Sequence, residues 1–158
     1  MEPIHVSLLV HFIGIGMIFT SLFGGWIVTG HYRKAADWKT KAAMLRVLRP
    51  IGLFSPAAIV VMIVSGFGNM GLLGYGVFTA AWLSAKLVFF LIMAVAGVIG
   101  GVKGGRRGKL VAQMAEGSAP EGSERVIASL DKQQRLFSAF QAIILLIILV
   151  LSIVKPHA

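Results

Sequence analysis

Residues 50–85 read PIGLFSPAAIVVMIVSGFGNMGLLGYGVFTAAWLSA, and these 36 residues include no Asp, Glu, Lys or Arg. A helix that crosses the hydrocarbon core of a bilayer needs about 20 apolar residues. The run is therefore too long for one crossing, and Gly71, Gly74 and Gly76 indicate a turn inside it. It predicts two membrane helices, over 51–71 and 79–102, joined by this turn.

Two further stretches without charged residues lie at 3–32 and 136–154. By the same length criterion they predict spans over 6–30 and 135–154. No basic segment precedes the first of them and no small-residue cleavage site follows it, so we expect a span and not a signal peptide. The sequence thus predicts an all-α integral membrane four-helix bundle that forms a single domain over 1–158.

The composition supports this class. AVILMFWYC residues make up 57% of the chain and charged residues 13%, which leaves too little polar surface for a water-soluble globule. A soluble enzyme, a disordered tail and a fibrous protein are therefore excluded, and the expected partner is a lipid bilayer. The net charge is +9, but no basic stripe with interleaved aromatic residues is present, so nucleic acid is not an expected partner.

The basic residues predict the orientation. Residues 31–50 hold six Lys and Arg against one acidic residue, and residues 103–135 hold seven against four. The turn between the second and third spans holds none. By the positive-inside rule, the basic loops 31–50 and 103–134 are expected to be cytoplasmic, with both termini on the outer, periplasmic side of a bacterial inner membrane.

His11 and Lys86 are polar residues that lie within predicted apolar spans, where such residues are uncommon. At 1.5 Å of rise per residue, each lies about 10 Å below the outer start of its helix. Because polar groups at this depth are costly unless they meet a partner or a cavity, the shared depth favours one common site in the outer leaflet. The alternatives are that the Lys86 side chain extends to the headgroups and that His11 makes a hydrogen bond between helices.

Small residues accompany both side chains. Helical spacing places these residues on two common faces: His11, Gly14, Ile18, Ser21 and Gly25 on the first span, and Lys86, Phe90, Met93, Gly97 and Gly100 on the third. Such faces let a flat macrocycle approach the helix, and a lysine nearby suits its propionates. They also serve close helix packing, which is the more common use of small residues in membrane bundles.

The spacing of the histidines limits how they can bind a haem. His11 and His31 lie twenty residues apart, about 30 Å along one helix, so they cannot ligate the same iron. His5 points to a different side of the helix from His11, and His157 is terminal. A haem on His11 would be five-coordinate, take Met93 as a weak second ligand, or be shared with a twofold-related chain. The absence of cysteine excludes thiolate metal sites and disulfides.

Several short motifs together resemble the group of small membrane proteins formed by HemJ-type protoporphyrinogen oxidases and CopD-like proteins. They occur in the same order and at similar spacing over most of the chain: His11, Ser55-Pro56-Ala57, Trp82-Leu83-Ser84-Ala85-Lys86-Leu87 and Ile153-Val154-Lys155-Pro156. The resemblance implies a helical bundle that binds haem b, with His11 and Lys86 matching the family's histidine and lysine. A Pro-Arg pair and a second histidine usual in the family are absent from residues 24–27 and 89–101, so no catalytic residue is assigned.

These observations favour a membrane redox protein that binds haem b through His11, with Gly14, Lys86 and Met93 beside the cofactor. It would act in electron transfer or, as the resemblance implies, as an oxidoreductase on protoporphyrinogen IX. The alternative is a non-catalytic subunit of a larger membrane complex or homo-oligomer, whose small-residue faces pack against neighbours. Copper handling by methionines is a third hypothesis, although methionines at helical spacing are usually core residues.

Overall fold

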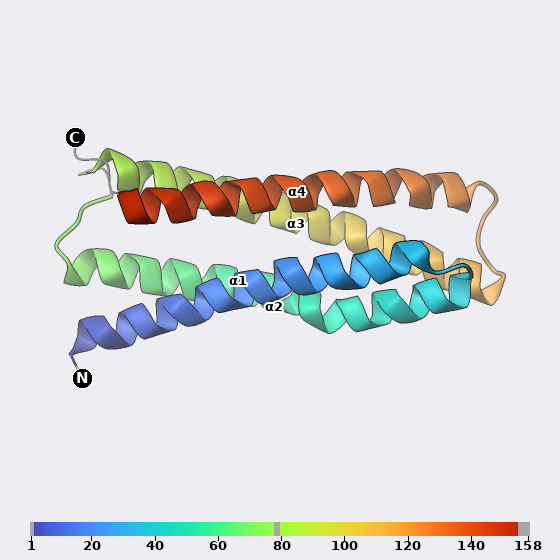
Figure 1. Ribbon diagram of the computed structural model, residues 1–158, viewed down its shortest axis with the longest axis horizontal. Helices are drawn as coiled ribbons and strands as arrows, with labels where there is room; N and C mark the ends of the chain where they lie inside the picture. The colour runs from blue at the N-terminus through green and yellow to red at the C-terminus, as the bar shows by residue number, and fades with distance from the viewer. Residues whose placement is uncertain (1, 78–79, 155–158) are drawn as a thin grey trace.

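The computed structural model describes residues 2–77 and 80–154 of the chain. It forms four helices, α1 (Pro3–Lys34), α2 (Trp38–Leu72), α3 (Ala81–Glu116) and α4 (Ser123–Val154), with no strand among the described residues (Figure 1). All four are long and apolar enough to cross a membrane. The predicted all-α, four-helix membrane fold is confirmed. Residue 79, where the third span was expected to begin, and residues 155–158, with the Lys155-Pro156 motif and His157, lie outside the described residues.

The helices extend well beyond the predicted apolar spans. The segments 31–50 and 103–134, expected as loops, are mostly helical, and the connections at this end reduce to 35–37 and 117–122. Asp37 starts α2, because its carboxylate accepts hydrogen bonds from the Thr40 backbone N–H at 2.8 Å and from the Thr40 hydroxyl at 2.7 Å. Gly117 ends α3 in the left-handed conformation, with φ of 73°.

The bundle is built from two antiparallel hairpins, α1 with α2 and α3 with α4 (Figure 1). The hairpins join along α2 and α3, whereas α1 and α4 barely touch. One small core lies at the end of the bundle where α1 and α3 finish, around Tyr32, Val111 and Ile127. A second lies within the apolar part of the hairpin α3–α4, around Met93, Ile144 and Leu145.

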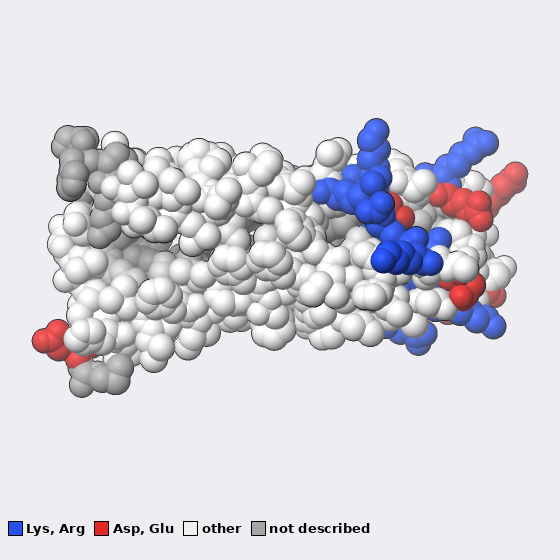
Figure 2. Space-filling view, in the orientation of Figure 1, with Lys and Arg blue, Asp and Glu red and all other residues white. Residues whose placement is uncertain are grey.

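Figure 2 shows that the Lys and Arg side chains gather at one end of the molecule. We call this end, formed by the last turns of α1 and α3 and the first turns of α2 and α4, the basic end. Large apolar side chains such as Phe12, Leu91 and Ile153 are exposed along the rest of the surface. An apolar exterior of this kind requires lipid around it, so the chain is a multi-pass membrane protein.

Candidate functional site

The His11 side chain extends from α1 toward α2, where its ring is hydrogen-bonded to Ser65. Its Nδ1 is 2.9 Å from the Ser65 hydroxyl, and that hydroxyl donates its own proton to the Val61 carbonyl at 2.6 Å. A hydroxyl has one proton, so when Ser65 donates it to Val61, Nδ1 is the donor to Ser65. In that tautomer the proton is on Nδ1 and the lone pair of Nε2 is available as a ligand.

The residues predicted beside His11 have different surroundings. Gly14 is buried, and a Cβ built on it would lie 2.9 Å from the Met62 sulfur and 3.1 Å from Val61 Cγ1. This part of the helix face therefore packs against α2. Lys86 stands over the Trp82 ring, with Nζ 5.3 Å from its centroid, and lies near enough to His11 for its positive charge to act on the imidazole.

Met93 lies in a different environment from His11. Its side chain is 6% exposed and packs in the core of Ile144 and Leu145. It also lines a large cavity, which His11, Gly14 and Lys86 do not. The structure thus places His11 and Gly14 in the α1–α2 interface and Met93 on the cavity. Among the residues described, no group of three His, Asp or Glu side chains is arranged to hold a metal ion.

The cavity has a volume of about 1080 Å³ and lies between the two hairpins, extending from Ile18 and Met93 to the basic end. Glycine and small polar residues form much of its wall. The later parts of the two faces predicted from the sequence both line it: Ile18, Ser21 and Gly25 on α1, and Met93, Gly97 and Gly100 on α3. The two faces therefore come together, but farther toward the basic end than His11 and Lys86.

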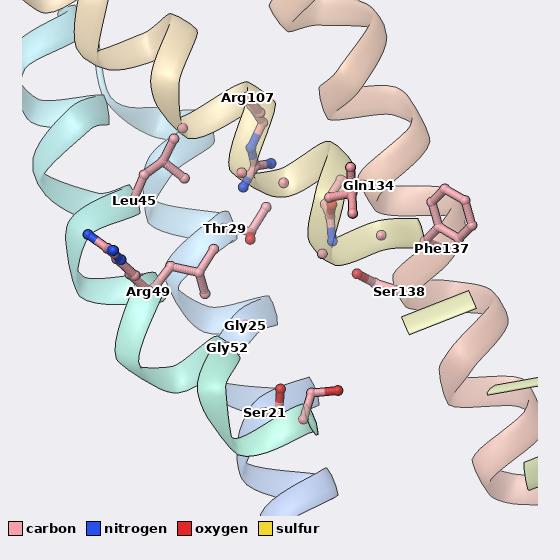
Figure 3. A pocket seen from close by; sticks show the side chains of 18 of the residues that line it. Ser21, Gly25, Thr29, Leu45, Arg49, Gly52, Arg107, Gln134, Phe137 and Ser138 are labelled. Atoms are coloured by element: carbon pink, nitrogen blue, oxygen red, sulfur yellow. The ribbon is translucent and has the colours of Figure 1, made fainter. Parts of the chain in front are cut away.

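The cavity wall is basic where it approaches the basic end. Its charged residues comprise five cations and one anion: Lys39, Arg46, Arg49, Arg107, Lys109 and Glu116. Arg107 is the buried member of this set, with its side chain 3% exposed. In Figure 3 its side chain extends from α3 into the space toward which Thr29 of α1 and Gln134 and Ser138 of α4 also point.

Arg107 belongs to a polar cluster that connects three helices. Its Nη1 donates to the Asp131 carboxylate on α4 at 3.1 Å, and the same carboxylate accepts a hydrogen bond from the Tyr32 hydroxyl on α1 at 3.2 Å. The guanidinium also lies over the Tyr32 ring, 5.1 Å from its centroid. The Arg107 Nε is buried and has no hydrogen-bond partner. A buried donor of this kind is costly unless an acceptor is supplied.

The same cluster changes the acidity of Tyr32, which lies beyond the apolar span 6–30. Burial, and after it the Asp131 charge, raises the pKa of its phenol to about 12, although the Arg107 charge acts in the opposite direction. Tyr32 is therefore a neutral hydrogen-bond donor at physiological pH.

Two prolines alter the hydrogen bonding of α2 beside the cavity. Pro50 and Pro56 lie inside the helix. Because proline has no N–H, the carbonyls four residues earlier, of Arg46 and Gly52, lose their usual helical donor. Both of these residues line the cavity.

Arg107 and its partners were missed in the sequence analysis. Arg107 lies in the run Gly104-Gly105-Arg106-Arg107-Gly108, within the segment 103–134 that the sequence predicts as a basic loop. A signal was present, because Gly97, Gly100, Gly104 and Gly108 follow helical spacing past the end of the apolar span. Extending the helix along this pattern would have placed Arg107 on the buried face of α3 and Arg106 on its exposed face.

Comparison with known proteins adds no relative. The chain matches no protein-family model, no curated protein and no solved structure.

Proposed function

We propose that the protein binds a carboxylated tetrapyrrole, the class of compounds that includes haem and its precursors, in the cavity between its two hairpins. The observation that carries this proposal is the buried Arg107, whose unpartnered Nε lies at the basic end of a glycine-lined cavity. An apolar body with a few anionic groups is complementary to such a site.

The size and shape of the cavity support this ligand class. Small-molecule sites commonly have volumes of about 300–1,000 Å³, so a cavity of about 1080 Å³ suits a large organic molecule. A wall without side chains at Gly25, Gly52 and Gly101 accepts a flat ring system close to the helix backbone, because a Cβ at Gly52 or Gly101 would meet nothing within 4 Å. The apolar part of the cavity would hold the ring, and its basic part would hold the carboxylates.

Charge gives the ligand its orientation. A guanidinium forms strong, directional hydrogen bonds with carboxylates. Arg107 already shares one of its nitrogens with Asp131, and its Nε would donate to a ligand carboxylate. Arg46 and Arg49, on the opposite wall, add positive charge without an acidic neighbour on the same stretch of α2.

The cavity does not supply a strong axial ligand for iron. No histidine is among the described residues that line it, and Met93 is a weak haem ligand buried in an apolar cluster. We therefore assign the cavity to a tetrapyrrole that is bound as substrate or cargo.

A second candidate function is electron transfer or protoporphyrinogen oxidation by a haem b ligated through His11. The specific support is the bond from Nδ1–H to Ser65, because metal-binding histidines are held by such a bond while the other nitrogen binds the metal. The positive charge of Lys86 near His11 suits the propionates of that cofactor.

One set of titrations tests both candidates. Protoporphyrin IX and haem are titrated into the purified protein and followed by fluorescence and by absorption in the Soret region. The test variant is Gly25→Leu, because its Cβ would lie 3.9 Å from Leu48 Cδ1 and the added side chain would occupy the cavity without a backbone clash. The matched control is Gly16→Leu on the same helix, where a Cβ meets nothing within 4 Å and the position does not line the cavity.

We expect Gly25→Leu to raise the Kd for protoporphyrin IX by at least about tenfold, equivalent to about 1.4 kcal/mol, and Gly16→Leu to leave it unchanged. Equal affinities of the two variants would contradict the cavity proposal. Loss of haem binding in His11→Ala, with protoporphyrin IX binding retained, would establish the second candidate as a separate site. A wild-type chain that binds neither compound would leave the non-catalytic subunit as the function.

The orientation of the chain belongs to the proposal as well. We propose that the basic end faces the cytoplasm of a bacterial cell, as the positive-inside rule predicts from its Lys and Arg content. The cavity would then be accessible from the inner leaflet of the cytoplasmic membrane.

A further inference from the structure

A groove on the α1–α4 side of the molecule leads toward the cavity. It has a volume of about 290 Å³ and is lined by four residues from each helix: Trp26, Thr29, Gly30 and Arg33, and Gln134, Arg135, Ser138 and Ala139. Thr29, Gln134 and Ser138 line both the groove and the large cavity. The two spaces therefore adjoin at these three residues, whose side chains are short or flexible.

The helices that border the groove are weakly joined. α1 and α4 barely touch, in contrast to the extensive packing within each hairpin. The side-chain hydrogen bond from Tyr32 to Asp131 joins them where the groove meets the basic end. Small rearrangements of Thr29, Gln134 and Ser138 would connect the groove to the cavity without breaking a hairpin.

The groove lies at the boundary between apolar and charged surface. Trp26 is 43% exposed, as is common for tryptophan at the level of lipid headgroups. Arg33 and Arg135 are exposed at the same groove, one on each helix. A molecule in the leaflet with an apolar body and an anionic group would meet apolar surface and arginine side chains in matching positions.

We propose that this groove is a side entrance through which a carboxylated tetrapyrrole dissolved in the leaflet reaches the cavity. The inference rests on the proposed function, because it supplies the route to the same site. Arg33 and Arg135 attract the carboxylates at the membrane surface, and Arg107, the buried cation inside, receives them. The ring system follows between α1 and α4 without leaving the bilayer.

Entry is tested by its rate. Protein in phosphatidylcholine vesicles is mixed with vesicles that contain protoporphyrin IX, and quenching of tryptophan fluorescence reports binding. The test variant is Gly30→Phe, since a Cβ at Gly30 meets nothing within 4 Å and the ring would fill the groove. The control is Gly16→Phe on the same helix, equally open and away from the groove.

We expect Gly30→Phe to slow both association and dissociation by about tenfold, the effect of about 1.4 kcal/mol on a barrier, while the Kd stays unchanged. Gly16→Phe should behave as the wild type. Association alone should slow in Arg33→Gln/Arg135→Gln, because charges at the rim of a site act mainly on the association rate.

The outcomes separate this inference from the function on which it rests. If the wild type binds protoporphyrin IX and all variants bind it at the same rate, the side entrance is wrong while the binding function stands. Entry then occurs between α2 and α3, where the cavity also reaches the surface beside Arg46, Arg49 and Lys109. If the wild type does not bind protoporphyrin IX, both proposals fail. If phosphatidylcholine itself occupies the groove and excludes the probe, the entrance is likewise overturned.

Discussion

Arg107 carries its charge inside the bundle, and two neighbours make this possible. Asp131 accepts one of its hydrogen bonds, and the ring of Tyr32 lies beneath the guanidinium. Removing one partner of a buried ion pair is strongly destabilising, because the other charge is then left unpaired. The cluster therefore positions a cation at the cavity wall and at the same time joins α1, α3 and α4.

The ionisation of Tyr32 gives this cluster a pH dependence. The pKa of Tyr32 rises from 10.0 to about 12 in the folded chain, so the folded state holds the phenolic proton more tightly than the unfolded state. The resulting stabilisation is fully present below pH 10 and is lost as the pH rises toward 12. We expect unfolding to become easier over this interval in the wild type and to a smaller degree in Tyr32→Phe.

The titration can be followed directly. The chain contains two tyrosines, so in a Tyr75→Phe background the phenolate absorption reports Tyr32 alone. We expect a midpoint near pH 12 that falls when Asp131→Asn removes the carboxylate charge. A midpoint near 10 in the folded protein would show that Tyr32 is not held as the structure describes.

Single residues differ in how far the sequence reveals them. His11 could be identified because a lone polar side chain in an apolar span has few ordinary explanations. Its bond to Ser65, 54 positions away, could not be, since it depends on which faces of α1 and α2 meet. Arg107 could not be identified for the opposite reason, because Arg106, Lys109 and other charged residues surround it in the sequence. Only the helix geometry shows that its side chain points inward while those of Arg106 and Lys109 point outward.

At the scale of elements, the number of helices was predictable and their lengths were not. The apolar stretches determine the four crossings, because lipid admits only backbone that satisfies its own hydrogen bonds. The helices extend past the apolar stretches at the basic end because of capping residues and glycine spacing, which a hydropathy profile does not detect. Asp37 caps α2, glycines continue the α3 pattern, and Gly117 stops it with a positive φ.

The packing of α1 on α2 depends on Gly14. A Cβ there would approach Val61 Cγ1 to 3.1 Å, and β-branched Val61 has little freedom to move away. We expect Gly14→Leu to destabilise the protein by about 1–3 kcal/mol, the usual cost of overpacking. Unfolding in a detergent series, monitored by circular dichroism, measures the change.

Gly16→Leu is the matched comparison for this prediction. A Cβ at Gly16 meets nothing within 4 Å, and replacing a helical glycine gains up to about 1 kcal/mol in helix propensity. Its stability should equal or exceed that of the wild type. Equal stability of the two variants would indicate that α1 and α2 do not pack through Gly14.

At the scale of the whole molecule, the distribution of charge predicts how the bundle lies in the membrane. The absence of cysteine allows single cysteines to be introduced without background labelling. Ser118, in the α3–α4 connection, and Leu73, in the α2–α3 connection, are both exposed and lie outside the cavity. In bacterial spheroplasts, a membrane-impermeant maleimide should label Leu73→Cys and should label Ser118→Cys only after lysis. The reverse pattern would place the basic end outside.

The sparse contact between α1 and α4 also bears on biosynthesis. Each hairpin makes most of its contacts internally, so α1 and α2 can pair in the bilayer while α3 is still being translated. Completion of the bundle then requires the association of two preformed units along α2 and α3 and through the Tyr32 contacts of α1 with α3 and α4. Cleavage of the peptide link between these units would leave two fragments that could reassociate through the same contacts.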